Sequence, residues 1–397
     1  MDKKNKNPNV PNLRFSYKGD WSKRKLNEIC LFFKGNGLSK SDLSNEGFPC
    51  ILYGELYTTY KNEVISDIIS KTNTILSNPF LSRNNDLIIP GSGENPIDTA
   101  VARAIYQNDI ILGGDLNILR PKSNVSAAFL SYQLNGVRRY DIAKKAQGKS
   151  IVHLHNSDLK EVLVSIPTYD EQLHIVELLT KIDEMMDAQI KIIGDYNSLK
   201  KGIIQHIFNV NYEFPNVHLK AVLKEISQKN KNRDNIDVLS VSNSLGFIKQ
   251  SEQFEDREIA SADTSNYKIV NKNEYAYNPA RINVGSIARL QSCDCGIVSP
   301  MYTVFKTDIS KISYEYFDLF LQSSTFQKQL NQKLEGSVRQ CLTFASMQNI
   351  LIELPPLEMQ IEISEKMKFI DSKIKIESDY LNLLKTEKEY LLKNMFV

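Results

Sequence analysis

Residues 166–172 read Ile-Pro-Thr-Tyr-Asp-Glu-Gln, and residues 354–360 read Leu-Pro-Pro-Leu-Glu-Met-Gln. Pro167 to Pro355 is a step of 188 residues, and the same step relates further identities without a gap. A period this long indicates duplicated domains, because solenoid repeats are much shorter. The chain is therefore expected to be built twice on one plan. The further identities are Gln172/Gln360, Ile175/Ile363, Glu177/Glu365, Ile182/Ile370, Asp183/Asp371, Lys200/Lys388 and Phe208/Phe396.

A long helix is expected behind each copy. Apolar residues recur at alternating three- and four-residue spacing over 169–208, which is the seam of a coiled coil. A second seam runs over 357–396, where Glu377 and Lys388 interrupt it. A proline before each segment ends the preceding strand and is tolerated in the first helical turn. About 40 residues make a helix of roughly 60 Å. Since an isolated helix exposing such a stripe would be unstable, the two helices are predicted to pack on each other in antiparallel fashion.

A longer stretch of different character precedes each helix. In the first, 86–91 and 110–114 read as buried strands that end in glycine turns, and the second echoes this order with few identities. The expected fold class is α+β, with two α/β domains separated by two long helices that form an antiparallel coiled coil and a pseudo-two-fold internal repeat. The predicted segments are an N-terminal extension at 1–20, a first domain at 21–165, a helix at 166–210, a second domain at 211–353 and a helix at 354–397.

Composition narrows the class of protein. The chain has 397 residues, of which 42% are apolar, enough for two to three domains with their own cores. It contains no run of about eighteen apolar residues, which argues against a membrane span. The five cysteines are odd in number and irregularly spaced, which favours reduced thiols in the cytoplasm. The net charge is only +2, so any grip on nucleic acid must come from local positive charge or from a partner.

The sequence lacks the motifs of two enzymes that act on DNA. An adenine methyltransferase needs an Asn/Asp-Pro-Pro-aromatic loop, whereas the one Pro-Pro pair, at 355–356, follows Leu354 and opens a helix. A common nuclease core needs Glu-x-Lys, which does not occur. These observations favour a binding protein over a self-contained methyltransferase–nuclease fusion. A coiled-coil scaffold without a role in DNA binding stays open as a third interpretation.

Several shorter patterns suggest a cofactor or a metal but are incomplete. The loop Gly148-Lys149-Ser150 resembles the end of a phosphate loop, but Ala143 stands where another glycine is required. The pairs His153/His155 and Cys293/Cys295 have no second pair at zinc spacing. The glycine pair in 91–93 indicates a tight turn. No bound cofactor or metal is therefore expected.

At these repeated residues the chain resembles the specificity (S) subunit of type I restriction–modification systems. The matching marks are the Pro-x-x-x-x-Gln motif at 167–172 and 355–360, an Ile-Asp pair inside each helix, and a Phe after each basic helix end. The opening 10–15 and the run 19–21 also resemble the N-terminus of family members. The resemblance covers essentially the whole chain. It departs at Thr168, where a second proline is usual, and at Met359, where Glu is usual.

This resemblance implies a non-catalytic subunit with two target recognition domains. Each domain would read one half of a split, asymmetric site in double-stranded DNA. The two helices would set the spacer and dock two methyltransferase (M) subunits, which transfer a methyl group from S-adenosylmethionine to adenine. Two restriction (R) subunits, which use ATP and Mg²⁺, would join afterwards. The S subunit itself would perform no chemistry and bind no cofactor.

Side chains that read DNA are Arg, Lys, Asn and Gln on short elements, with further cations and hydroxyls on phosphates. Two polar loops meet this description just before the helices, and their glycines, Gly148 and Gly336, are related by the step of 188. The alternative is a solvated hairpin turn for the loops and ordinary surface charge for scattered cations. The loop candidates are Gln147, Lys149, Ser150, Ser337, Arg339 and Gln340. The scattered candidates are Arg83, Arg103, Arg138, Arg139, Lys144, Lys145, Lys231, Arg233, Arg281 and Arg289.

The helix seams supply the candidate residues for packing between the helices and for docking of the M subunits. They are Ile175, Ile182, Leu199, Ile203, Ile363, Ile370, Leu384 and Leu391.

Overall fold

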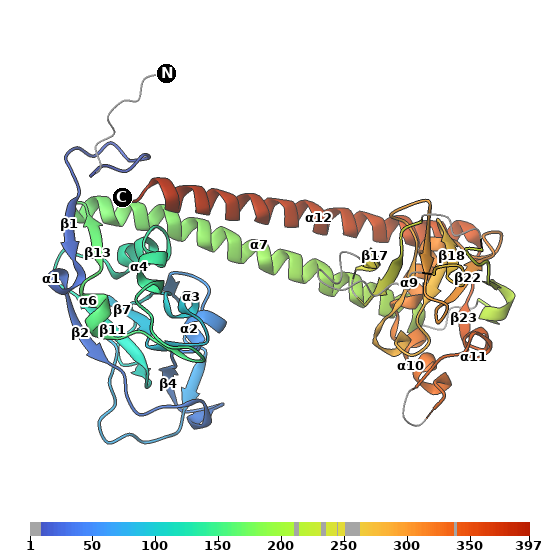
Figure 1. Cartoon of the computed structure of the whole chain (residues 1–397), viewed down its shortest axis with the longest axis horizontal. Coiled ribbons are helices and arrows are strands. Elements are labelled where there is room, and N and C mark those ends of the chain that lie inside the picture. Colours follow the sequence, from blue (N-terminus) through green and yellow to red (C-terminus); the bar gives the residue numbers. More distant parts are fainter. Residues whose placement is uncertain (1–8, 210–213, 232–235, 244, 251–262, 337–339) are drawn as a thin grey trace. The chain divides into compact units, whose positions relative to one another are not determined.

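The computed structural model describes residues 9–209, 214–231, 236–243, 245–250, 263–336 and 340–397 (Figure 1). It divides into two compact units. Unit 1 comprises residues 1–191 and 378–397, and unit 2 comprises residues 192–377. Two long helices, α7 (Tyr169–Asn209) and α12 (Leu357–Asn394), lie within the two predicted helical segments. Helix α7 begins in unit 1 and ends in unit 2, whereas α12 begins in unit 2 and ends in unit 1.

Unit 1 is built around a five-stranded mixed sheet in the order β2-β11-β7-β9-β5. Its neighbours pair antiparallel except for β5 and β9, which are parallel. A four-stranded sheet in the order β10-β4-β6-β3 and the ribbons β1-β13 and β8-β12 complete it. The strands are β1 (Ser22–Lys25), β2 (Cys30–Lys34), β3 (Leu43–Ser44), β4 (Phe48–Ile51), β5 (Val64–Ile65), β6 (Ser70–Thr72), β7 (Asp86–Pro90), β8 (Ser92–Gly93), β9 (Arg103–Ile105), β10 (Ile111–Leu112), β11 (Leu116–Pro121), β12 (Val152–His153) and β13 (Leu163–Ile166).

Helix α4 (Ala127–Asn135) is the central helix of unit 1. Residues 127–134 are all buried, as expected for a helix that is apolar on most sides. The Ser126 hydroxyl accepts a hydrogen bond from the Phe129 amide and caps the first turn. The shorter helices of the unit are α1 (Leu26–Ile29), η1 (Lys40–Asp42), α2 (Glu55–Thr58), α3 (Pro96–Thr99), α5 (Arg139–Ala143) and α6 (Asn156–Lys160).

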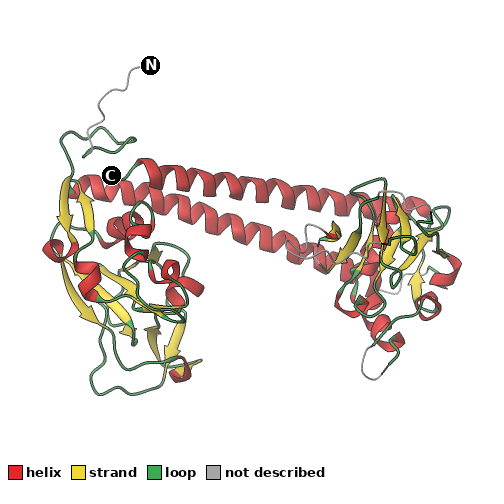
Figure 2. Cartoon of the chain, in the orientation of Figure 1, coloured by secondary structure: helices red, strands yellow, loops and turns green. Residues whose placement is uncertain are grey.

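Unit 2 contains a four-stranded antiparallel sheet in the order β15-β22-β19-β20 and three ribbons, β14-β23, β16-β17 and β18-β21. Figure 2 shows strands and helices intermixed in each unit. The strands are β14 (Asn216–His218), β15 (Leu223–Ile226), β16 (Leu239–Ser242), β17 (Gly246–Lys249), β18 (Lys268–Asn271), β19 (Tyr275–Tyr277), β20 (Ile287–Arg289), β21 (Cys295–Val298), β22 (Thr303–Thr307) and β23 (Leu351–Glu353). The helices are η2 (Leu219–Ala221), η3 (Ile282–Val284), α9 (Tyr314–Leu321), α10 (Ser324–Lys333) and α11 (Phe344–Gln348).

Within each unit the start of one long helix packs beside the end of the other. In unit 1, Ile175 and Leu179 of α7 share a hydrophobic core with Leu391 of α12. In unit 2, Ile204 of α7 shares a core with Met367 of α12. The two domain cores thus continue directly onto the helices, so that each domain is held by both helices at once.

Candidate nucleic-acid interface

The repeated glutamine fixes the head of each long helix to its own domain. The Gln172 side-chain oxygen accepts from the Ser126 amide at 2.9 Å, and its nitrogen donates to the Pro167 carbonyl at 3.2 Å. The Gln360 side chain makes the same two contacts, accepting from the Ser313 amide at 2.8 Å and donating to the Pro355 carbonyl at 2.8 Å. Both glutamines are fully buried. The sequence motif therefore records a structural fastening rather than a contact with a ligand.

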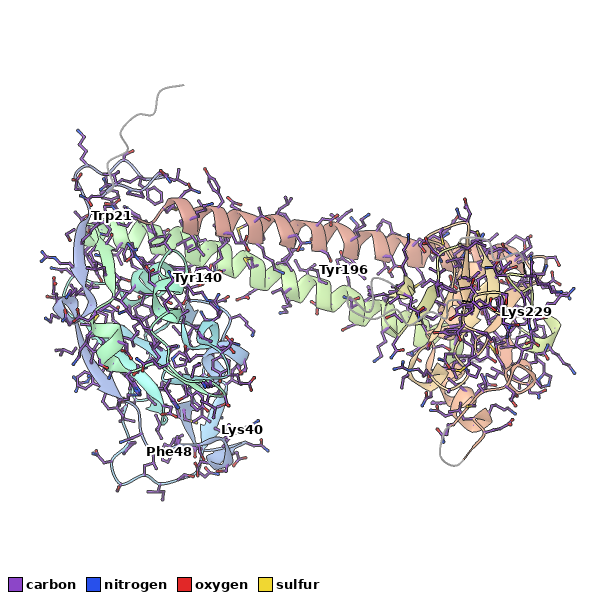
Figure 3. All side chains as sticks on the ribbon, viewed as in Figure 1. Trp21, Lys40, Phe48, Tyr140, Tyr196 and Lys229 are labelled. Atoms are coloured by element: carbon purple, nitrogen blue, oxygen red, sulfur yellow. The ribbon has the colours of Figure 1, made fainter. Side chains whose placement is uncertain are left out.

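An N-terminal segment fastens the helix ends of unit 1. The Arg14 guanidinium donates to both carboxylate oxygens of Glu171, at 2.6 and 2.7 Å, and the Trp21 indole donates to the same carboxylate at 3.2 Å. The Leu13 amide donates to the Asn394 carbonyl of α12 at 2.9 Å. Figure 3 shows Trp21 at this end of α7. The corresponding residue of the second copy is Met359, which has no carboxylate to offer.

The two predicted loops are each closed by an equivalent pair of backbone hydrogen bonds, and the residues between these bonds are called the first and second hairpin. Gln147 and His153 exchange backbone hydrogen bonds of 2.9 and 2.7 Å, and Glu335 and Cys341 exchange bonds of 2.9 and 2.8 Å. Each residue of the second closing pair lies one step of 188 after its counterpart in the first pair. Gly148 adopts a φ of +138°, and a Cβ there would approach the Ile151 carbonyl oxygen to 2.0 Å. Only glycine suits this turn.

The first hairpin presents polar side chains to solvent. Gln147, Lys149 and Ser150 are exposed, as is Gln340 of the second hairpin, while Ser337 and Arg339 lie outside the described residues. A solvated turn has the same geometry, so the DNA-binding role of these residues stays a prediction.

The scattered cations separate into two groups. Arg83, Lys144, Lys231 and Arg281 are exposed and Lys145 is half-buried, while Arg233 lies outside the described residues. The other four predicted DNA-binding arginines, Arg103, Arg138, Arg139 and Arg289, hold parts of the fold together.

Arg103 is 7% exposed and donates to the Tyr60 carbonyl at 3.1 Å, and its burial lowers the pKa of its guanidinium. Arg289 pairs with Asp318 at 2.7 Å. The Arg138 and Arg139 side chains donate to backbone carbonyls, at 2.9 Å to Val397 and at 3.5 Å to Ile97. Sequence alone did not distinguish these four from free surface charge, because their partners are distant along the chain.

Seven of the eight predicted helix residues serve packing. Ile175, Ile182, Leu384 and Leu391 are buried, and Ile203, Ile363 and Ile370 are half-buried against the core of unit 2. Leu199 is 52% exposed. The apolar side chains that α12 leaves exposed lie elsewhere and were not singled out by the seam. They are Ile361, Phe369 and Ile376 in unit 2 and Tyr380, Leu383 and Tyr390 in unit 1. A second period of seven, through 369, 376, 383 and 390, is the sequence signal for four of them, Phe369, Ile376, Leu383 and Tyr390.

The motifs that suggested chemistry form no catalytic arrangement in the described residues. Ser92 lies 2.9 Å from the Nδ1 atom of His153 and 3.2 Å from the Asp115 carboxylate. A nucleophilic triad needs the carboxylate to orient the histidine, whereas here both groups contact the serine. The Lys149 loop closes a hairpin rather than opening a helix. Among the described residues, no group of three or more His, Cys, Asp or Glu side chains could hold a metal ion.

No helix in the described part of the chain combines the length and the hydropathy needed to cross a bilayer.

The family comparison matches both units. A family profile described as the type I restriction modification DNA specificity domain matches residues 18–193 and 224–386. The type I restriction enzyme MjaVIII specificity subunit of Methanocaldococcus jannaschii is 21% identical over 391 residues, which cover 90% of this chain and 88% of that protein. The resemblance found in the sequence is thereby confirmed.

Solved structures show the same fold. The S subunit of a type I restriction–modification system from M. genitalium matches with a TM-score of 0.60 at 16% identity, over 98% of this chain and 99% of that one. A chain from a structure that addresses complex assembly and conformational transition of the type I restriction–modification system matches with a TM-score of 0.59 at 13% identity, over 96% and 98%. The chain belongs to the family of type I restriction–modification DNA specificity subunits.

Proposed function

We propose that this chain is the non-catalytic DNA-reading subunit of a type I restriction–modification complex, in which each unit reads one half of a split, asymmetric site. The observation that carries the proposal is the duplicated fastening. Gln172 and Gln360 attach two domains of different sequence to equivalent positions on the two long helices. Two recognition domains of different sequence (the two readers), held on one frame of two long helices, suit a DNA site whose two halves differ in sequence. Linkage then makes engagement of the second half-site effectively intramolecular.

The two long helices are proposed to form an antiparallel coiled coil with pseudo-two-fold symmetry. The ring of Phe396, just after α12, packs against that of Phe129 of α4, with 5.3 Å between the ring centroids. The ring of Phe208, near the end of α7, packs against that of Tyr316 of α9, with 5.2 Å between the centroids. Phe208 and Phe396 are related by the step of 188. Such a pair would set the spacer between the half-sites.

Docking of the M subunits is assigned to the exposed apolar side chains of α12. Leu383 and Tyr390 in unit 1 are 67% and 59% exposed, and Phe369 in unit 2 is 63% exposed. Large apolar side chains on a helix that is otherwise polar on its outer face mark a protein interface. In this proposal two M subunits carry S-adenosylmethionine, two R subunits supply ATP- and Mg²⁺-dependent steps, and this chain binds neither cofactor.

DNA contact is assigned to the two hairpins and to the exposed cations Arg83, Lys144, Lys231 and Arg281. Hairpins closed by the same backbone bonds in both units give the proposal its structural support. Positive side chains on such loops neutralise phosphates, and amides or guanidinium groups reach base edges.

The first prediction separates this function from a self-contained enzyme and from a scaffold. The purified chain alone is expected to transfer no methyl group to DNA, whereas the chain assembled with its M partner methylates adenine at a split motif. Labelled methyl incorporation into duplex DNA measures both. Transfer by the isolated chain, with M shown to be absent, would establish the fusion-enzyme interpretation. An assembled complex that binds no duplex would favour the scaffold.

A second prediction concerns the first hairpin. Lys149→Ala combined with Ser150→Ala should weaken DNA binding by the assembled complex. If these residues grip phosphate, the loss is uniform across sequences and the salt slope falls by about one. If they read a base, the loss is confined to one position and amounts to about 1–3 kcal/mol.

The matched control is Lys181→Ala on α7, which removes an exposed lysine whose partner is Glu177. If the double variant binds DNA with unchanged affinity and salt dependence, the first hairpin is a solvated turn without a role in DNA binding.

A further inference from the structure

A buried charge cluster joins three segments of unit 1. The Lys388 ammonium group of α12 lies 2.6 Å from the Glu63 carboxylate, which precedes β5, and 2.5 Å from the Asp183 carboxylate of α7. The three side chains are 13%, 7% and 4% exposed. Tyr132 of α4 donates its hydroxyl to the second oxygen of Asp183 at 2.7 Å, and the Asn135 amide donates to Glu63 at 3.3 Å. One cation thus bridges the domain and both long helices.

Holding three segments together through this cluster carries a large desolvation cost, because three charged groups are removed from water. Burial raises the pKa of the Asp183 carboxyl, even though Lys388 acts in the opposite sense. Burial acts to lower the pKa of Lys388, but the carboxylates of Glu63 and Asp183 raise it further, and the net direction is upward. Apolar side chains of the same volume often stabilise a protein as well or better than a buried ion network. Such a network adds a fixed relative orientation of the segments that it joins, because its charged groups pair in one geometry. Two apolar surfaces can slide along each other without losing their contact.

The described residues of unit 2 contain the counterpart of only part of this cluster. Lys200 and Asp371, each related by the step of 188 to Lys388 and Asp183, form an ion pair of 2.5 Å. That pair is solvated, with side chains 22% and 52% exposed. The residue one step after Tyr132 is Phe320, which has no hydroxyl and packs against Phe208 instead. Among the residues that the structure describes, the closed network therefore occurs in unit 1.

We propose that Glu63, Lys388 and Asp183 form a positioning network that fixes the rotation of the first recognition domain about the ends of α7 and α12, and so the register in which its half-site is read. The inference rests on the proposed DNA-reading function and deepens it by naming the residues that align one reader. Lys388 has no contact with DNA in the proposed complex and acts through the orientation of the domain. The first half-site and the spacer should then depend on this network, and the second half-site should not.

The test compares two variants in the assembled complex with M. Lys388→Met leaves two buried carboxylates without their cation, so the melting temperature of the complex should fall by roughly 10 °C. The triple variant Glu63→Gln, Asp183→Asn, Lys388→Met removes all three charges and keeps hydrogen-bonding amides in place, so its melting temperature should lie close to that of the parent.

Methylation mapping then distinguishes alignment from stability. In the stable triple variant, methylation at sites whose first half is displaced by one base pair should rise about tenfold or more relative to the parent. A tenfold change is about the discrimination that a recognition domain gains from one correctly read base pair. The second half-site should be unchanged. The matched control is Lys200→Met, which breaks the solvated pair of unit 2 and should alter neither the motif nor the spacer.

Two outcomes overturn the inference. A triple variant with parental stability, motif and spacer would reduce the network to a dispensable contact, and a shift of both half-sites together would show that it does not act on one reader. If the triple variant does not assemble, Glu63→Gln alone, which keeps the Lys388–Asp183 pair, carries the same mapping. A parent complex that methylates no split motif would instead refute the proposed function, which makes the two failures distinguishable.

Discussion

Four residues inserted into each long helix are expected to lengthen the spacer between the two half-sites by about one to two base pairs and to leave both half-sites unchanged. A helix rises about 1.5 Å per residue, so four residues add ~6 Å and rotate the following segment by only ~40°, while DNA rises ~3.4 Å per base pair. The insertion points are between Ile193 and Gly194 in α7 and, one step of 188 later, between Leu381 and Asn382 in α12.

The structure favours these insertion points. Gly194 is exposed, and apart from its chain neighbours and the local helix backbone no atom lies within 4 Å of the position that a Cβ would occupy. Asn382 is also exposed. The domain contacts lie further toward the helix ends, at Ile175 and Leu179 in unit 1 and at Ile204 in unit 2. Extending both helices keeps their lengths matched, so that each end keeps its own partner.

The contrasting variant inserts two residues at the same points. This rotates the following helix segment by ~200° and turns Ile204 and Phe208 away from the core of unit 2, where they are 3% and 8% exposed. We expect this variant to lose assembly with M and all methylation. Size-exclusion chromatography and methylation mapping of both variants beside the parent provide the measurement. A fully active four-residue variant with the parental spacer would show that the helices do not set the distance between the readers.

The long helices were predictable from sequence because their signal is local. Apolar residues that recur every three or four positions over 169–208 and 357–396 can be recognised without any knowledge of the rest of the chain. The repeated Gln172 and Gln360 marked the important position, but their role needed the structure. Each contacts the amide of a serine that caps another helix, and that pairing depends on the fold of the whole domain.

The division of labour among charged and apolar side chains was not predictable in the same way. Arg103 stands on β9 within the five-stranded sheet, and nothing in its neighbours along the chain indicates that its guanidinium reaches the Tyr60 carbonyl. The same holds for Lys388, whose two partners lie 205 residues or more away in sequence. Period alone also gives two stripes on α12, and only packing shows that Leu384 is covered while Leu383 is not.

Exchange of the first recognition domain tests whether each domain reads its own half-site independently of the other. Residues 21–165 are replaced by the corresponding domain of another family member, with glutamate kept at position 63 so that Lys388 retains its partner. Methylated adenines are then mapped in DNA from cells that express the hybrid with its M partner, beside cells that express the parent. We expect one half of the methylated motif to become that of the donor, while the other half and the spacer keep the parental form. A motif in which both halves change together would contradict two independent readers on one frame.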